Sequence, residues 1–322
     1  MGKIIIDCLG GDNPQEELAI GTTDCLDLPV DFVLVGEKEV LGKTLSNKGA
    51  DLSRYEIIDK KNTITNDDNP RLVVAGSEDT SLVSGLLRAK EDDVIAFISP
   101  GNTGAILLGS IFRLGLLPNI KFPALGCFLV NRDWRRVLLL DCGANVDMKP
   151  GDLTKFAKMG SAYMSAFLEG KDARIGLLNV GKEEGKGNAF SKEAHNLLKE
   201  SGLNFVGNIE GNDILTGQAD VVLTDGFSGN IVLKAIESTA AICREIVQKA
   251  SKNDESSAII NEEIHRMFGY TDLGASLVLG CRKIVLKPHG SSTRQTIRSV
   301  VELALEIHER KAIDGLGKAF GE

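Results

Sequence analysis

Long apolar runs are missing from this chain of 322 residues. The longest, such as VLLL at 137–140, are far shorter than the roughly 20 residues that a membrane-spanning helix needs. The sequence therefore argues against a helix that crosses a bilayer. The first residues, MGKIIIDCLGG, contain no long apolar stretch followed by a cleavage site, so we expect no signal peptide.

Clustered metal ligands and paired cysteines are also lacking. None of the six cysteines shows C-x-x-C spacing, and several lie in apolar stretches. This is typical of reduced, buried thiols in the cytoplasm rather than of a zinc site or a disulfide framework. The four histidines are scattered along the chain, so we predict no metal and a cytoplasmic location.

Basic residues are outnumbered, and the net charge is −8. An acidic balance argues against nucleic acid as a partner. A hydrophobic content of 43% and a charged content of 25% are ordinary for a globular protein with a full core. The length favours a single α/β/α unit over residues 1–322 with two intimately associated subdomains, whose boundaries the sequence does not locate.

Strand-like stretches alternate with helical patterns along the whole chain. The expected strands are 3–9, 31–36, 55–59, 93–99, 123–130, 135–141, 174–181, 204–210, 220–225 and 283–288. The expected helices are 15–27, 37–47, 71–90, 103–116, 152–169, 191–201, 230–252, 256–268 and 293–311. Several strands are apolar throughout, as in sheets covered on both faces. The alternation predicts an α/β fold with a doubly wound, mostly parallel sheet.

Glycine and asparagine recur where predicted strands end, at 99–104, 141–147, 179–188 and 224–230. Ligands of open parallel sheets bind outside the carboxyl ends of the strands. Glycine permits close backbone approach, and helices that begin there direct N–H groups at the same region. Each corner alone is more often a turn or a helix cap. Together they favour an anion-binding pocket.

Motifs of other enzyme classes fail at specific positions. Residues 181–188 are not a phosphate-binding P-loop, because Lys186 stands where glycine is required. Residues 315–321 do not match the dinucleotide fingerprint. The corner at 226–230 has Asn230 where a nucleophile elbow requires glycine, so Ser228 is interpreted as a turn hydroxyl. A pocket that binds anions but lacks a nucleophile suits a reaction in which inorganic phosphate is the nucleophile.

An ordered set of motifs spans about residues 3–311, and it resembles the phosphate acyltransferase (PlsX) family of bacterial phospholipid synthesis. The motifs are DCLGGDNP (7–14), SPGNTGA (99–105), LLDCGANVD (139–147), LLNVGKEEGKGN (177–188), DVVLTDGFSGNIVLK (220–234), GAS (274–276) and HGSS (289–292). Cys8-Leu9 replaces the usual Ala-Met of the first motif.

The resemblance implies a fold like that of isopropylmalate dehydrogenases and phosphotransacetylases, with two α/β parts and a cleft between them. It implies transfer of an acyl group from acyl-acyl carrier protein to inorganic phosphate, without a cofactor. It further implies a homodimer, and a membrane glycerol-phosphate acyltransferase as a further partner.

Candidate residues follow from these motifs. Phosphate is expected at Gly101, Asn102, Thr103, Gly104 and Ser291, and the alternative for this corner is a simple helix cap at Thr103. The expected catalytic residues are Lys186, Asn188, Asp225, Asn230 and His289. Lys186 lies between two glycines, where the alternative is a solvated lysine, and Asp225 is expected to orient it. His289 is a candidate general acid or a structural histidine. Asp7, Asp141, Asn145 and Lys234 are expected to line the cleft.

The sequence also bears on contacts with other molecules. The segment 251–273, where the family often carries a longer apolar hairpin, is short and polar here. Its apolar positions Ile260, Ile264, Met267 and Phe268 share one helical face. We expect this face to pack against a second subunit, with at most weak membrane contact. Two basic clusters could steer an acidic carrier protein: Arg132, Arg135 and Arg136, or Arg282, Lys283 and Lys287. The second is expected nearer the chemistry.

Competing functions remain open from the residues alone. One is a coenzyme A-dependent phosphotransacylase, or an acyl-phosphate-forming subunit of a larger complex. Another is a decarboxylating dehydrogenase of the same architecture, which would need an aspartate cluster for a metal. A third is a regulator that binds acyl carrier protein or phosphate without catalysis.

Overall fold

The computed structural model describes residues 1–76, 78–250, 259–260, 263–264 and 275–321. It has the expected α/β fold with mostly parallel strands. The chain divides into two compact units. Unit 1 is Met1–Pro123 with Gly274–Glu322, and unit 2 is Ala124–Leu273. Unit 1 is therefore built from both ends of the chain, a division that the sequence did not locate.

The sheet of unit 1 is parallel except at one edge. Its strands are β1 (Gly2–Asp7), β2 (Val30–Gly36), β3 (Tyr55–Asp59), β4 (Val94–Ile98), β10 (Ser276–Leu279) and β11 (Ile284–Lys287). They lie in the order β3-β2-β1-β4-β11-β10, and only β10 is antiparallel to its neighbour β11. Consecutive residues Ile4, Ile5 and Ile6 are all fully buried, because helices cover both faces.

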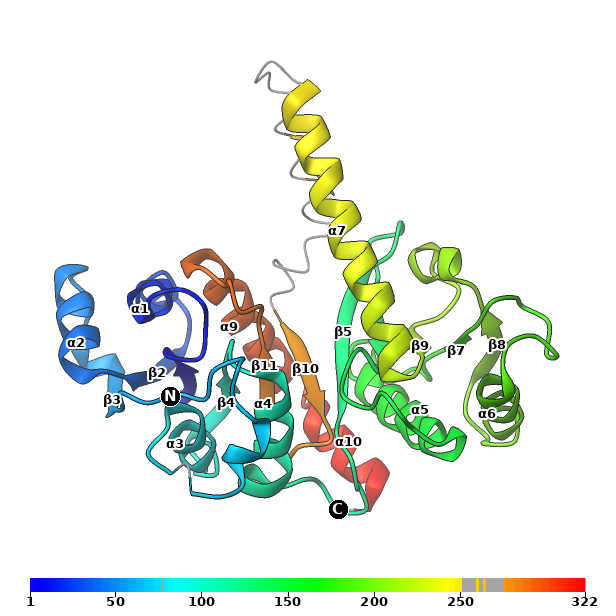
Figure 1. Cartoon of the computed structure of the whole chain (residues 1–322), viewed down its shortest axis with the longest axis horizontal. Coiled ribbons are helices and arrows are strands. Elements are labelled where there is room, and N and C mark those ends of the chain that lie inside the picture. The colour runs from blue at the N-terminus through cyan, green and yellow to red at the C-terminus, as the bar shows by residue number, and fades with distance from the viewer. Residues whose placement is uncertain (77, 251–258, 261–262, 265–274, 322) are drawn as a thin grey trace. The chain divides into compact units, whose positions relative to one another are not determined.

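The helices of unit 1 are divided between the two faces of its sheet. They are α1 (Gln15–Thr23), α2 (Lys38–Asn47), α3 (Ser81–Arg88), α4 (Thr103–Gly109), α9 (Arg294–Glu309) and α10 (Ala312–Phe320), with the short turns η1 (Leu52–Arg54), η2 (Pro70–Val73) and η3 (Ser110–Leu114). Helices α1 and α9 pack together on one face, and α3 and α4 lie on the other (Figure 1). This is the doubly wound arrangement that right-handed crossovers produce.

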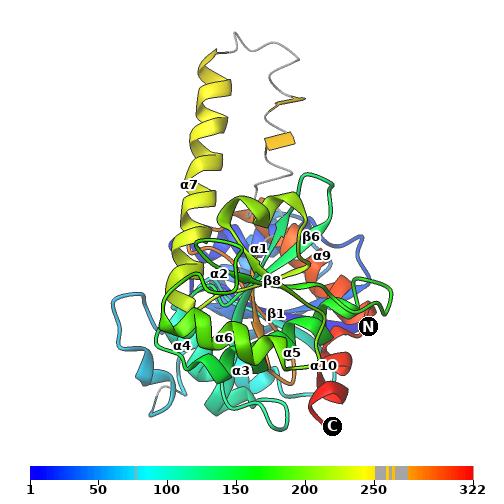
Figure 2. The same cartoon turned by 90° about the vertical axis from the view of Figure 1, so that its right-hand side faces the viewer.

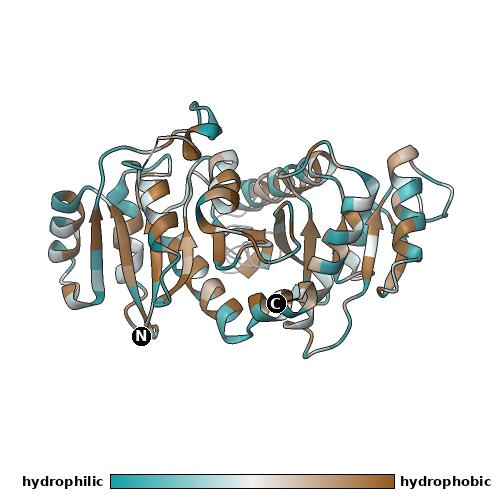
Figure 3. Cartoon of the chain, turned by 90° about the horizontal axis from the view of Figure 1, so that it is seen from below, coloured by the Kyte–Doolittle hydropathy of each residue, from teal (hydrophilic) through white to brown (hydrophobic). Residues whose placement is uncertain are grey.

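Unit 2 repeats this plan with a shorter sheet. Its strands are β5 (Ala124–Val130), β6 (Arg136–Leu140), β7 (Ile175–Leu178), β8 (Phe205–Ile209) and β9 (Val221–Leu223), in the order β5-β6-β9-β7-β8. Only β5 is antiparallel to its neighbour β6. Its helices are α5 (Pro150–Ser165), α6 (Ala189–Lys199), α7 (Gly226–Ala250) and the short η4 (Gly211–Thr216). Helices α5 and α6 lie side by side (Figure 2), and the strands of each unit are predominantly apolar (Figure 3).

Some predicted helices differ from those of the structure. The single helix predicted over 71–90 is wrong: η2 ends at Val73, and α3 begins only at Ser81. Between them Gly76 has a φ of 78°, which a right-handed helix does not allow. The predicted helix over 256–268 lies mostly outside the described residues. No helix in the described ranges is long and apolar enough to cross a membrane.

Helix α10 was not predicted at all, because Gly315 and Gly317 within it weaken an isolated helix. Packing of its apolar face stabilises this helix in spite of its low intrinsic helix propensity. Ala312, Leu316 and Phe320 recur every four residues and are buried. Strand β10 was also missed, since its four residues are too few to show a period.

Candidate active site

Loops that follow parallel strands of unit 1 meet at one edge of its sheet. The backbone N–H of Asp12 donates to the carbonyl of Gly290 at 2.8 Å. The side-chain amide of Asn13 donates to the carbonyls of Ser291 and Ser292, at 3.0 and 2.9 Å. The motif after β1 is thereby joined to the motif after β11, as expected for the carboxyl edge of a parallel sheet.

The carboxylate of Asp7 joins the loop after β1 to the loop after β4. It accepts a hydrogen bond from Ser99 Oγ at 2.7 Å and one from the N–H of Leu9 at 3.3 Å. Ser99 Oγ in turn accepts from the N–H of Gly101 at 3.2 Å. Burial raises the pKa of Asp7, while its hydrogen-bond donors oppose the rise. Asp7 is fully buried, so it supports the 99–102 loop from beneath and does not line a surface.

The corner at 99–104 becomes the start of α4. Asn102 caps this helix, because its Oδ1 accepts from the N–H of Ala105 at 3.0 Å. Its Nδ2 donates to the carbonyl of Thr65 at 3.0 Å. The N–H groups of Thr103 and Gly104 find no acceptor within the described part of the chain. The backbone donors of this corner are thus available to an anion. The Asn102 side chain instead caps α4 and holds the loop at Thr65.

His289 and Ser291 form a closed turn. The backbone N–H of Ser291 donates to His289 Nδ1 at 3.2 Å, and Ser291 Oγ lies 2.8 Å from the same nitrogen. A ring nitrogen that accepts from an amide carries no proton, so this geometry assigns the proton of the neutral ring to Nε2. Any proton that His289 supplies to a substrate therefore comes from Nε2.

In unit 2, Asp141 gathers the loop that follows β6. One carboxylate oxygen accepts from the N–H groups of Gly143 and Ala144, both at 3.0 Å. The other accepts from the N–H of Asn145 at 2.8 Å and from its Nδ2 at 2.7 Å. Burial raises the pKa of Asp141, and these donors oppose the rise. The loop therefore encloses an anion, and that anion is the protein's own side chain.

The corner TDGFSGN is the first turn of α7. This helix begins at Gly226, four residues before the predicted start at Asn230. Asp225 precedes it and accepts from the N–H of Ser228 at 2.8 Å, which is a helix cap. Asn230 is exposed, and Lys234 pairs with Glu237 at 2.7 Å.

The glycines of this corner allow one segment of the chain to approach another. A Cβ atom on Gly229 would lie 1.9 Å from the carbonyl oxygen of Asp141, and one on Gly226 would lie 2.8 Å from the backbone of Asn145. Neither contact is possible for a larger residue. The sequence suggested that these glycines make room for a ligand, but the room is taken by the loop 141–145.

The loop after β7 presents Lys186 and Asn188. Asn179 Nδ2 donates to the carbonyl of Lys186 at 3.2 Å. Asn188 caps α6, because its Oδ1 accepts from the N–H of Ser191 at 2.8 Å. The side chain of Lys186 is exposed and has no ion-pair partner among the residues that the structure describes. Its charge is therefore available to a ligand.

A cavity of about 490 Å³ lies at the carboxyl ends of β7 and β9. Its polar lining residues are Asn179, Asn188, Ser191, Thr224, Asp225 and Ser228, and its apolar ones include Leu177, Leu178, Val180, Phe190 and Val232. Two of the predicted catalytic residues, Asn188 and Asp225, thus share one cavity. Lys186, Asn230 and Lys234 are not among its lining residues. The sequence analysis did not single out Asn179, although its place at the end of β7 matches that of the other asparagines.

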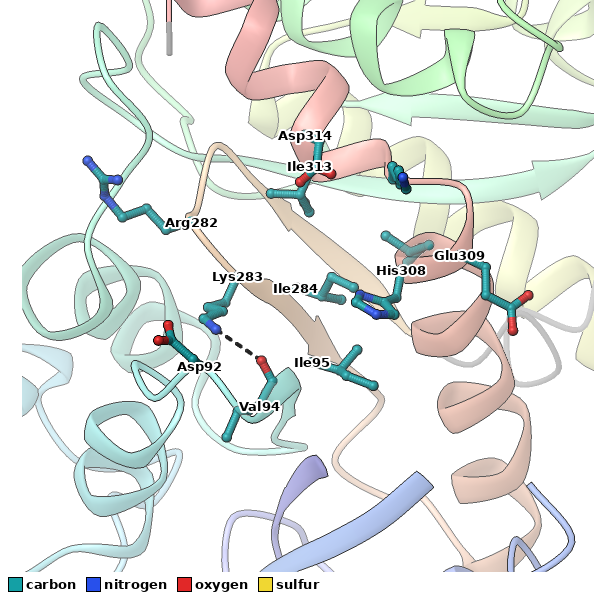
Figure 4. Close-up of a pocket in the computed structure, with 12 residues that line it drawn as sticks. Asp92, Val94, Ile95, Arg282, Lys283, Ile284, His308, Glu309, Ile313 and Asp314 are labelled. Atoms are coloured by element: carbon teal, nitrogen blue, oxygen red, sulfur yellow. Dashed lines mark hydrogen bonds between the residues drawn. The ribbon is translucent and has the colours of Figure 1, made fainter. Parts of the chain in front are cut away.

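The basic cluster Arg282, Lys283 and Lys287 was expected to adjoin the motifs at 274–276 and 289–292, and the structure divides it. Lys287 ends β11 beside His289 and pairs with Ser276, whereas Arg282 and Lys283 lie at the other end of the strand. Both precede β11, and His289 follows it, so the strand separates them. Lys283 Nζ donates to the carbonyl of Glu91 at 2.9 Å and to that of Val94 at 3.0 Å, the second of which Figure 4 shows. Both basic residues line a different cavity of about 460 Å³ near the α9–α10 corner. Their charge is therefore at the amino edge of the sheet of unit 1.

The other basic cluster lies at the turn between β5 and β6. Arg136 stacks its guanidinium on the rings of Phe128 and Phe167, at 5.4 and 5.5 Å from their centroids. This end of β6 is opposite the end that carries Asp141. Within the described residues, no group of histidine, cysteine, aspartate and glutamate side chains is arranged to hold a metal ion.

The fold and these loops define an α/β protein of the phosphotransacetylase architecture. A phosphotransacetylase from Streptococcus pyogenes matches with a TM-score of 0.63 over 97% of this chain and 94% of its own, at 18% identity. A 4-hydroxythreonine-4-phosphate dehydrogenase from Klebsiella pneumoniae matches with a TM-score of 0.55 over 95% of this chain and 99% of its own, at 12% identity. At these identities the likeness concerns the fold alone.

The family is shown by sequence. A family model described as "Fatty acid synthesis protein" matches residues 2–314. A phosphate acyltransferase from Clostridium tetani is 35% identical over 98% of this chain and 96% of its own. One from Oceanobacillus iheyensis is 36% identical over 95% of this chain and 94% of its own. The chain belongs to the phosphate acyltransferase family, and it is an enzyme that transfers an acyl group to phosphate.

Proposed function

We propose that the acyl donor is a fatty acyl thioester of acyl carrier protein and that the acyl phosphate formed enters phospholipid synthesis. The family description, fatty acid synthesis protein, supports a fatty acyl substrate. The observation that carries the proposal is the cavity of unit 2, which is lined by both polar and apolar residues. Such a cavity suits a thioester attached to an alkyl chain.

The reaction needs positioned donors rather than a covalent nucleophile. A phosphate oxygen attacks the thioester carbonyl carbon, the new C–O bond forms, and the C–S bond breaks. The departing thiolate has a conjugate acid with a pKa of roughly 8–9, so it needs little assistance. Within unit 1, the N–H groups of Thr103 and Gly104, which have no acceptor among the described residues, are suited to an anion such as phosphate. Within unit 2, the charge of Lys186, which has no ion-pair partner among the described residues, is suited to an oxyanion such as the one that develops on a thioester carbonyl oxygen.

The proposed partners are acyl carrier protein, a second copy of the chain and a membrane glycerol-phosphate acyltransferase that uses the product. Exposed apolar residues of α7 support a homodimer. Phe227, Ile231, Ile242 and Ile246 are 54–59% exposed, and their spacing places them on one helical face. The six cysteines are unpaired thiols, which is consistent with the cytoplasm.

Trapping the product with hydroxylamine tests the proposal, because acyl phosphates form acyl hydroxamates rapidly. We expect hydroxamate that depends on both acyl-acyl carrier protein and phosphate, with a kcat/KM at least tenfold above that for acyl-coenzyme A of equal chain length. A preference for acyl-coenzyme A would replace the proposed donor with the phosphotransacylase alternative. Product that forms without phosphate would reject the phosphate acceptor in this chain.

A further inference from the structure

The carboxylate of Asp141 is fully enclosed by donors of its own chain. Besides the N–H groups of Gly143, Ala144 and Asn145, it accepts from the N–H of Leu125 at 3.3 Å. Its side chain is 0% exposed. A ring of N–H groups of this kind binds an anion, and here the anion is built in. Because these donors point inward, none of them is available to phosphate or to a thioester.

The same loop holds the start of α7 at several points. The carbonyl of Asn145 accepts from the N–H of Gly226 at 2.9 Å. On the other side of Asp225, the N–H of Asp141 donates to the carbonyl of Thr224 at 3.0 Å. Gly229 then lies directly against the carbonyl oxygen of Asp141. Asp225, a lining residue of the unit 2 cavity, is therefore fixed from both sides by a loop whose shape Asp141 determines.

We propose that Asp141 is a positioning residue: its buried carboxylate shapes the 141–145 loop, and that loop sets Asp225 at the wall of the unit 2 cavity. The proposal rests on the proposed function, since it takes this cavity to be where the acyl donor binds. Asp141 contacts no substrate in this scheme. It acts through Asn145 and the first turn of α7.

Chemical rescue provides the main test. Asp141→Ala removes the carboxylate and leaves a space surrounded by N–H donors, which formate can occupy. We expect kcat to fall at least tenfold and to recover in a saturable way with sodium formate but not with sodium chloride. Asp141→Leu is the matched control, because its side chain fills the space, and formate should not rescue it. The proposal would be overturned if Asp141→Ala had the same kcat as the wild type. It would also be overturned if formate had equal effects on the two variants.

A double-mutant cycle separates positioning from a general loss of stability. If Asp141 acts through Asp225, combining Asp141→Asn with Asp225→Ala should lower kcat no further than the more damaging single change. Asp220→Asn is the control, because Asp220 precedes β9 and pairs with Arg174 at the opposite edge of the sheet. As a single change, Asp220→Asn should leave kcat unchanged. Combined with Asp225→Ala, it should lower kcat no further than Asp225→Ala does by itself. Independent, multiplicative losses for Asp141 and Asp225 would contradict the coupling.

Hydrogen exchange gives a readout that does not depend on the substrate. In Asp141→Ala, the amides of 226–230 should exchange at least tenfold faster, and formate should slow them again, while the amides of α5 stay unchanged. If wild-type protein made no acyl phosphate but these amides responded in this way, the proposed function would fail and the link from Asp141 to α7 would stand. Unchanged exchange at 226–230 would reject the link whatever the activity.

Discussion

Lys186 has an exposed side chain and directly precedes Gly187 and Asn188, which line the unit 2 cavity, although Lys186 itself is not among the lining residues. Its backbone carbonyl is held by Asn179, and Gly187 beside it has a φ of 92°, so the main chain is fixed while the side chain extends into solvent. A cation held this way can stabilise an oxyanion that forms only in the transition state. The alternative of a merely solvated lysine makes the opposite prediction for turnover.

We expect Lys186→Ala to lower kcat by about 10²–10³-fold, as for other oxyanion donors, without changing the melting temperature. Initial rates at saturating phosphate and donor measure this effect. Lys192→Ala, which removes another exposed lysine shortly after it in the chain, is the control and should retain full activity. If Lys186→Ala kept a near-normal kcat, Lys186 would be a solvated lysine without a role in catalysis.

At the scale of elements, α7 can approach the loop 141–145 closely because Gly229 has no side chain. A Cβ atom at Gly229 would meet the Asp141 carbonyl oxygen, and backbone atoms cannot rotate aside as a flexible side chain can. By contrast, a Cβ atom at Gly151, in the first turn of α5, would meet nothing within 4 Å. These two helical glycines therefore form a matched pair.

Gly229→Ala is expected to lower the free energy of unfolding by about 1–3 kcal/mol, because overpacking forces the helix away from the loop. Gly151→Ala should be neutral or stabilising by up to about 1 kcal/mol, since alanine favours helix. Urea unfolding of both variants measures the difference. Equal stabilities would mean that α7 and the loop do not approach each other as described.

At the scale of the whole molecule, acid stability depends on ion pairs that connect strands. Arg174 and Asp220 precede β7 and β9, and their side chains make two hydrogen bonds, Nε to Oδ2 at 3.0 Å and Nη2 to Oδ1 at 2.8 Å. Burial opposes the ionisation of Asp220, but the hydrogen bonds from Arg174 outweigh it, so the pKa of Asp220 lies below its ordinary value of 3.8. The pair thus favours the folded state when Asp220 is ionised.

The sign of the pH dependence follows from this lowered pKa. The contribution of Asp220 is fully present above its unfolded pKa of 3.8 and is lost as the pH falls through the folded value. We expect Asp220→Asn to lower the free energy of unfolding at pH 7 by about 1–2 kcal/mol, a range that allows for the partial exposure of Arg174. Urea unfolding from pH 7 to pH 2 should show the difference from wild type shrinking with acid. A difference that stays constant with pH would contradict the assignment.

The sequence by itself determined the alternation of strands and helices and the side of the sheet where the motifs lie. Both depend on short-range patterns: apolar runs mark buried strands, and parallel strands end at one edge. It also placed Asn102 directly before a helix at 103–116, although the cap proved to be Asn102 and not Thr103. These features need no knowledge of what lies across the sheet. The capping role of Asn188 was not predicted, because the expected helix began only at 191.

Only the tertiary structure decided which groups are occupied and which are available. The glycines of the α7 corner and the aspartate at 141 look like parts of a ligand site in the sequence, yet the first accommodate a loop and the second fills a ring of donors. Likewise Arg282 and His289 are close in sequence but lie at opposite ends of β11. The physical reason is that a local pattern fixes the conformation of a segment, whereas a donor is used up by whichever distant segment packs against it.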